Sequence, residues 1–142
     1  HFIDRMMRKN QITREQFEKL PPEHRVIDLL RQTLSEQANG EALLNDAELD
    51  YYAAHFSKSG FTGPINWYRN WSDNWRQLDG VNHQIEIPTL FIGASNDLVI
   101  DPRYIEGMKP LVSDLTIHVL DCGHWTQQER PDEVNRLLLE WL

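Results

Sequence analysis

The fold is decided by two stretches of sequence, Thr89-Leu90-Phe91-Ile92-Gly93-Ala94-Ser95-Asn96-Asp97 and Asp121-Cys122-Gly123-His124-Trp125. In the first, an apolar run over 89–93 leads into a polar turn that carries Asp97. The second follows another apolar run, over 115–120, and its turn carries His124. The chain between the two runs is long enough for one helix. This order predicts two parallel strands of an α/β protein, joined by a right-handed crossover.

Asp97 and His124 form the candidate site. Both follow the carboxyl end of a predicted strand, where the functional residues of parallel sheets gather. Neighbouring strands lie about 4.8 Å apart, so the two side chains are expected to form a hydrogen bond. A carboxylate that orients a histidine supplies two members of a nucleophilic triad. The third member, the nucleophile, is not evident in this sequence.

Two residues beside the pair are weaker candidates for that nucleophile. Ser95 lacks the second glycine of a G-x-S-x-G elbow, because Asp97 stands in its place. Cys122 is close to His124 in sequence, and such neighbours in a turn rarely face each other. Gly123 is expected to give the backbone the freedom for a tight turn that presents His124 to a cleft.

Other acidic residues near the turns are expected to have structural roles. Asp101 precedes Pro102 and fits the N-cap of a short helix better than a catalytic acid. Asp121, Cys122 and His124 do not have a spacing that closes a tetrahedral metal site. The sequence therefore predicts no metal and no cofactor.

The residues before the first strand predict helices. Thr13 with Gln16 and Asn45 with Glu48 have the pattern of capping boxes, which mark helix starts. Apolar residues at helical spacing follow in two segments: Val26, Leu29, Leu30 and Leu34, and then Leu49, Tyr52, Ala53 and Phe56. Asn39-Gly40 and Gly60 are expected to end these helices.

A tryptophan stripe marks the next predicted helix. Gly63-Pro64 starts this helix, with Pro64 suited to its first position. The stripe consists of residues four apart on one face, Trp67, Trp71 and Trp75, which predicts core or interface packing. Tyr68 is offset from the stripe and points elsewhere. A tyrosine on a helix over a cleft can stabilise a developing oxyanion, although spacing alone favours a packed core residue.

Asp79-Gly80 predicts a turn and the boundary between two parts of the chain. Residues 1–78 form a helical subdomain, and residues 79–142 hold the strands and their helices. The last helix is expected to begin at Arg130-Pro131. Its apolar side consists of Val134, Leu137, Leu138 and Trp141.

Composition narrows the classes of function. The chain has 142 residues and a net charge of −8, which makes a nucleic-acid backbone an unfavourable partner. The apolar runs are far shorter than the roughly 20 residues of a membrane-spanning helix. The loose basic cluster of Arg5, Arg8 and Lys9 fits a solvated helix face. Cys122 is the single cysteine, which predicts a reducing compartment, the cytoplasm.

Two segments resemble the soluble epoxide hydrolases of the α/β-hydrolase fold. One is Ser59-Gly60-Phe61-Thr62-Gly63-Pro64-Ile65-Asn66-Trp67-Tyr68-Arg69-Asn70, and the other is Asp121-Cys122-Gly123-His124-Trp125-Thr126-Gln127. The resemblance extends over roughly residues 46–142. It implies the C-terminal part of an α/β-hydrolase fold: residues 79–142 are its C-terminal strands and helices, and residues 1–78 are part of a helical cap subdomain.

The resemblance also implies a chemistry. Members of this family attack a small-molecule epoxide with a carboxylate, form an alkyl-enzyme ester and hydrolyse the ester with water. It implies that Tyr68 assists ring opening, that His124 is the base and that Asp97 is its partner. Leu98, Val99 and Trp125 would line the substrate pocket. A homodimer is compatible with this prediction.

The family's nucleophile elbow, its HGxP oxyanion loop and its second tyrosine have no counterpart in this sequence. We expect all three upstream, so the chain is interpreted as a C-terminal fragment that is inactive alone. Two alternatives stay open: a haloalkane or haloacid dehalogenase of the same fold, and a non-catalytic helical module that uses the tryptophan stripe as its interface.

Overall fold

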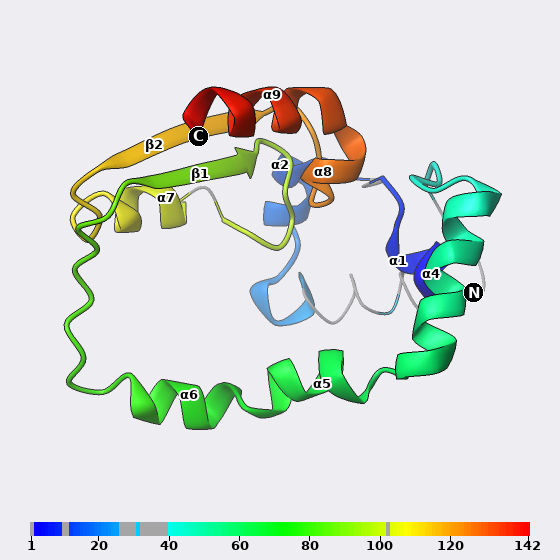
Figure 1. Ribbon diagram of the computed structural model, residues 1–142, viewed down its shortest axis with the longest axis horizontal. Coiled ribbons are helices and arrows are strands. Elements are labelled where there is room, and N and C mark those ends of the chain that lie inside the picture. The colour runs from blue at the N-terminus through cyan, green and yellow to red at the C-terminus, as the bar shows by residue number, and fades with distance from the viewer. Residues whose placement is uncertain (1, 10–11, 26–30, 32–39, 102) are drawn as a thin grey trace.

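The structure is a computed structural model that describes residues 2–9, 12–25, 31, 40–101 and 103–142 (Figure 1). The elements with assigned bounds are α1 (Phe2–Met6), α2 (Arg14–Glu18), α4 (Asp46–Ser59), α5 (Thr62–Arg69), α6 (Trp71–Gln77), β1 (Thr89–Ala94), α7 (Arg103–Met108), β2 (Leu115–Leu120), α8 (Thr126–Glu129) and α9 (Pro131–Trp141). The helix predicted from the apolar residues between 26 and 34 lies outside the described residues.

Strands β1 and β2 form the predicted parallel pair. Their register runs from Thr89 opposite Leu115 to Ala94 opposite Leu120. A further parallel bridge joins Ile85 to Val112 before the strands begin. The apolar runs of the sequence therefore mark the strands to within one residue. Helix α7 lies in the crossover, as the strand–helix–strand order predicted.

Helix α9 covers one face of this sheet near its carboxyl edge (Figure 1). The buried cluster there consists of Ala94, Leu120, Cys122, Val134 and Leu137. Pro131 occupies the first turn of α9, where a missing N–H costs no helical hydrogen bond. The predicted apolar side of α9 is only half correct. Val134 and Leu137 are buried, whereas Leu138 and Trp141 are exposed.

The two predicted capping boxes are present. The Thr13 side chain accepts from the N–H of Gln16 at the start of α2, and the Gln16 side chain accepts in return. Asn45 and Glu48 make the same reciprocal bonds at the start of α4. Helix α4 ends at Gly60, whose φ of +64° is a conformation that favours glycine. Short local sequence patterns therefore predicted the starts of α2 and α4 and the end of α4 correctly.

The predicted tryptophan helix is two helices. Helix α5 begins at Thr62, so Pro64 stands at its third position rather than its first. The helix ends at Arg69, and α6 begins at Trp71. The tryptophans of the stripe are exposed, Trp67 by 79% and Trp75 by 78%, so the prediction of core packing within this chain is wrong. Gly80 makes the predicted turn after α6, with φ of +75°.

Candidate functional site

The pairing of β1 and β2 continues beyond the strands and brings their two turns together. The N–H of Ser95 donates to the carbonyl of Leu120 at 2.9 Å. The N–H of Asn96 donates to the carbonyl of Cys122 at 3.1 Å. These bonds hold the turn that carries Asp97 against the turn that precedes His124.

Asp97 and His124 are in contact at this edge. Nδ1 of His124 lies 3.0 Å from Oδ2 and 3.1 Å from Oδ1 of Asp97. Asp97 is buried, with 6% of its surface exposed. Its Oδ1 also accepts from the N–H groups of Val99 at 2.7 Å and Ile100 at 3.0 Å. The carboxylate is thus fixed from two sides, by its own turn and by the imidazole.

These contacts shift both groups toward their charged forms. Burial would raise the pKa of Asp97, but the hydrogen bond from His124 and the N–H groups of Ile100 and Val99 lower it below its ordinary value. The hydrogen bond to Asp97 raises the pKa of His124, against burial, with the charges of Asp97 and Glu129 adding to the rise. The ion pair therefore stabilises the fold between these two pKa values. The stabilisation is lost as pH falls through the pKa of Asp97 or rises through that of His124.

In neutral His124, the contact at Nδ1 assigns a tautomer. The hydrogen-bond network places the proton on Nδ1, facing the carboxylate, and leaves the lone pair on Nε2. A histidine held in this way can accept a proton at Nε2, and the carboxylate then stabilises the imidazolium. The pair can therefore serve as a general base.

The turn before His124 is held by α8 and the residue after it. The N–H of Gly123 donates to Glu129 at 2.9 Å, and the Arg130 side chain donates to the carbonyl of Asp121 at 2.8 Å. The prediction about Gly123 is corrected: it does not adopt the left-handed conformation, which the described glycines use at positions 40, 60 and 80. Its buried N–H has a carboxylate partner instead.

Trp125 connects the site to the first helix. Its Nε1 donates to the carbonyl of Met6 at 2.8 Å, although 119 residues separate the two. Its ring meets the His124 ring edge to face, with centroids 5.3 Å apart. Of the other residues predicted to line the pocket, Leu98 is buried and Val99 is 55% exposed.

Tyr68 lies apart from the pair. It belongs to α5, which in Figure 1 lies across from β1 and β2, on the far side of α2. Its side chain is 66% exposed, and its ring neighbour is Trp71 at 6.1 Å. Within the described part of the chain, no hydrogen bond or ring contact joins Tyr68 to Asp97 or His124. The prediction of a packed core tyrosine is therefore wrong.

The weaker nucleophile candidates have other roles in the structure. The hydroxyl of Ser95 donates to the carboxylate of Asp121 at 3.2 Å. Cys122 is buried in the core cluster, and that burial raises the pKa of its thiol, which keeps it protonated. Among the residues with assigned positions, no group of three or more His, Cys, Asp or Glu side chains could hold a metal ion.

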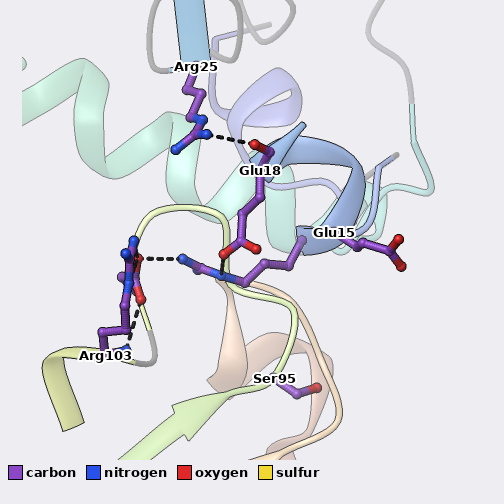
Figure 2. A pocket seen from close by; sticks show the side chains of 7 residues that line it. Glu15, Glu18, Arg25, Ser95 and Arg103 are labelled. Atoms are coloured by element: carbon purple, nitrogen blue, oxygen red, sulfur yellow. Dashed lines mark hydrogen bonds and ion pairs between the residues drawn. The ribbon is translucent and has the colours of Figure 1, made fainter. Parts of the chain in front are cut away.

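A pocket of about 640 Å³ lies beside the Asp97 turn but does not include the pair. Figure 2 shows Ser95 at the end of β1, Arg103 on α7 and Glu18 above them. The lining carries charges of both signs and consists of Arg14, Glu15, Glu18, Arg25, Ser95, Asp101 and Arg103. Asp101 accepts from the N–H of Arg103 at 2.8 Å, which confirms its predicted place at the start of a helix.

Arg14 and Glu129 support the candidate site but are not marked by any sequence motif. Arg14 contacts the Asp97 turn from a position more than 80 residues away. Glu129 binds the turn that presents His124. Neither residue belongs to a local pattern, so only the three-dimensional arrangement identifies them.

Comparison with known proteins agrees with this architecture. A family model described as the alpha/beta hydrolase fold matches residues 9–131. Bifunctional epoxide hydrolase 2 of Sus scrofa is 42% identical over 109 residues, which are 75% of this chain and 20% of that protein. Epoxide hydrolase A of Mycobacterium tuberculosis is 40% identical over 112 residues, which are 77% of this chain and 35% of that protein. The chain thus spans about a fifth to a third of the length of these relatives.

Solved structures give the same result. Epoxide hydrolase A from Mycobacterium thermoresistibile superimposes with a TM-score of 0.68 and 32% identity, over 99% of this chain and 46% of that one. A mutant of potato epoxide hydrolase gives a TM-score of 0.62 and 36% identity, over 69% of this chain and 34% of that one. Within the described residues, no helix has the length and apolar character that crossing a membrane requires. The chain belongs to the alpha/beta hydrolase fold family, and the relatives that it resembles within that family are epoxide hydrolases.

Proposed function

We propose that the chain is the C-terminal part of an epoxide hydrolase and that it supplies the base for hydrolysis of a covalent intermediate. The observation that carries this proposal is the contact of His124 Nδ1 with the Asp97 carboxylate at 3.0 Å, at the carboxyl edge of the parallel strands. The epoxide hydrolases among its relatives indicate the substrate class. The nucleophile, the oxyanion loop and a second tyrosine are proposed to lie N-terminal to His1.

The first step opens the epoxide. A carboxylate oxygen of the upstream nucleophile attacks a ring carbon, forms a carbon–oxygen ester bond and breaks the bond from that carbon to the epoxide oxygen. The oxygen leaves as an alkoxide that takes the hydroxyl proton of Tyr68. A hydrogen-bond donor aimed at developing negative charge stabilises the transition state more than the ground state.

The second step hydrolyses the ester. Nε2 of His124 takes a proton from water, and the resulting hydroxide attacks the ester carbonyl. The acyl carbon–oxygen bond then breaks, which releases the vicinal diol and restores the nucleophilic carboxylate. Asp97, ionised and bound to Nδ1, stabilises the imidazolium during this step. His124 then returns its proton to the diol alkoxide, and the proton of the carboxylic acid formed by hydrolysis passes to the Tyr68 phenolate that ring opening left, which restores both residues.

We propose that residues 1–78 form part of a helical cap and residues 79–142 the C-terminal portion of the hydrolase core. The turn at Gly80, between α6 and β1, supports this division. The bond from Trp125 to the carbonyl of Met6 and the bond from Arg14 to the Asp97 turn join the two parts. Leu98, Val99 and Trp125 are proposed to line the substrate pocket. The cytoplasmic location and the homodimer stay predictions.

Turnover assays with the full-length protein test the proposal. Styrene oxide should be converted to its vicinal diol, and rapid quenching followed by mass spectrometry should detect the ester intermediate. Halide release from 1,2-dibromoethane without diol formation from styrene oxide would support the dehalogenase alternative. Absence of both activities would overturn the catalytic proposal and favour an interaction module.

The pH dependence of ester hydrolysis should change in Asp97→Asn. In the unaltered protein the rate should rise as His124 loses its proton, with a midpoint above the ordinary histidine pKa because Asp97 raises that pKa. Asparagine removes the charge, so the midpoint should move to lower pH. The plateau rate should fall about 100-fold or more, because the imidazole loses its orientation.

Single-turnover rates between pH 5 and 9 measure both effects. Asp114→Asn, at the opposite edge of the sheet from His124, is the control and should leave the profile unchanged. An unchanged midpoint in Asp97→Asn would remove Asp97 from its assigned role.

Expressed alone, the 142-residue chain should associate rather than remain a monomer. The exposed tryptophans of α5 and α6 and the unpaired edges of a two-stranded sheet favour contact between copies. Size-exclusion chromatography with light scattering measures this association. A double variant, Trp67→Gln with Trp75→Gln, should associate less. A monodisperse monomer with cooperative melting would contradict the interpretation as a fragment.

A further inference from the structure

Arg14 makes an unusual set of contacts with the loop between β1 and α7. Its backbone N–H donates to Oδ1 of Asn96 at 2.7 Å. Its guanidinium donates to the carbonyl of Asp97 and, at 3.1 Å, to the carbonyl of Ile100. The same group forms an ion pair with Asp101 at 2.9 Å. One residue of α2 therefore contacts four positions of the loop that carries the proposed catalytic acid.

The surroundings of Arg14 make these contacts strong. Its side chain is 15% exposed and that of Asp101 is 17% exposed, so water screens the ion pair less than at an open surface. A planar guanidinium presents five N–H donors in a fixed fork, whereas an ammonium group presents three donors from a single nitrogen. Glu18, one turn along α2, forms a second ion pair with Arg14 at 3.1 Å and holds its orientation.

The two carbonyls that bind Arg14 belong to the turn that fixes the catalytic carboxylate. Inside the turn, Oδ1 of Asp97 accepts from the N–H groups of Val99 and Ile100. On its other side, Arg14 holds the carbonyls of Asp97 and Ile100, at the two ends of the turn. Loss of the guanidinium would leave both carbonyls and the Asp101 carboxylate without this donor. The turn could then widen and move the Asp97 carboxylate away from His124.

We propose that Arg14 is a positioning residue that holds the Asp97 turn in register with His124, and its catalytic consequence rests on the proposed function. Arg14 contacts neither substrate nor the reacting atoms in this proposal. It acts through the backbone of the turn.

The pKa of His124 distinguishes this positioning role from the direct electrostatic effect of removing the positive charge of Arg14. Asp97, on the β1–α7 loop, and Glu129, on α8, are the charged groups that raise this pKa. Removing a nearby positive charge would by itself raise the pKa of His124 further. Loosening the Asp97 contact would instead lower it toward the ordinary value. The two effects have opposite signs.

The experiment compares Arg14→Met, Arg14→Lys and Arg25→Met in the full-length protein. Arg25 is the matched control, because it also donates to backbone carbonyls, those of Glu18 and Leu20, but not to the Asp97 turn. Histidine resonances are titrated by NMR, with His124 assigned from the His124→Gln variant. In the same variants, single-turnover experiments measure the rate of alkylation by styrene oxide and the rate at which the resulting ester is hydrolysed.

Arg14→Met should lower the pKa of His124 and slow ester hydrolysis about 10-fold to 100-fold, with alkylation unchanged. Arg14→Lys should give intermediate values for the pKa of His124 and for the rate of ester hydrolysis. If Arg14→Met does not fold, the Arg14→Lys variant alone tests the positioning role. Arg25→Met should resemble the unaltered protein. An unchanged or raised His124 pKa in both Arg14 variants would overturn the proposal. If the pKa falls but the unaltered protein opens no epoxide, the positioning role stands and the proposed function fails.

Discussion

His124→Gln in the full-length protein should stop turnover at the covalent ester. Attack by the carboxylate needs no base, so alkylation should continue at close to its normal rate. Attack of water on the ester needs a proton acceptor, and glutamine supplies none at neutral pH. Loss of the triad histidine in a serine protease lowers kcat by about 10⁶-fold, and a loss of that order here would make the adduct persist for hours. Intact-mass spectrometry should show an increase equal to the mass of the epoxide.

The control for this variant is His55→Gln. His55 lies on α4, is exposed, and its Nδ1 contacts the carbonyl of Tyr51 in its own helix. It should form diol normally and accumulate no adduct. Normal turnover by His124→Gln would remove His124 from the mechanism. Loss of both alkylation and hydrolysis would show that His124 is needed before the ester forms.

The features that the sequence predicted correctly are local ones or follow from strand polarity. Apolar runs placed β1 and β2 to within one residue, because the strands of parallel sheets are typically apolar on both faces. The Asp97–His124 contact followed from the strand order, because the carboxyl ends of parallel neighbours share an edge. The capping box at Thr13 was readable because its partners lie three residues apart.

The features that the sequence did not predict depend on distant contacts. Arg14 and the Asp97 turn are joined only in the folded chain, and no spacing rule relates them. The bond from Trp125 to Met6 is of the same kind. The turn at Gly123 was expected to depend on the conformational freedom of glycine. It is held instead by the Glu129 carboxylate on α8, which accepts a hydrogen bond from the N–H of Gly123. A helical period shows that residues share one face of a helix, but it does not show whether another part of the chain covers that face. It therefore could not show that Trp67 is exposed.

Tyr68→Phe should slow alkylation and leave ester hydrolysis unchanged. The phenol donates a proton only to the oxygen that leaves the epoxide carbon, so its removal raises the barrier of ring opening. Removal of one such donor typically costs on the order of 100-fold in rate. The second tyrosine proposed upstream would reduce that loss if it can hold the oxygen alone. Tyr68 is 66% exposed and its hydroxyl is not part of a buried network, so the thermal stability should hardly change.

Tyr51→Phe is the matched control, because Tyr51 is 63% exposed and also lies in the helical part of the chain. Single-turnover measurements with styrene oxide separate ester formation from ester hydrolysis in both variants. Slow alkylation in Tyr68→Phe alone would support proton donation, and it would also require α5 to approach the Asp97–His124 edge in the full-length protein. Equal alkylation rates in the two variants would exclude Tyr68 as the donor. The epoxide interpretation would then lose its most specific residue, whereas the proposed role of His124 as general base would not depend on that result.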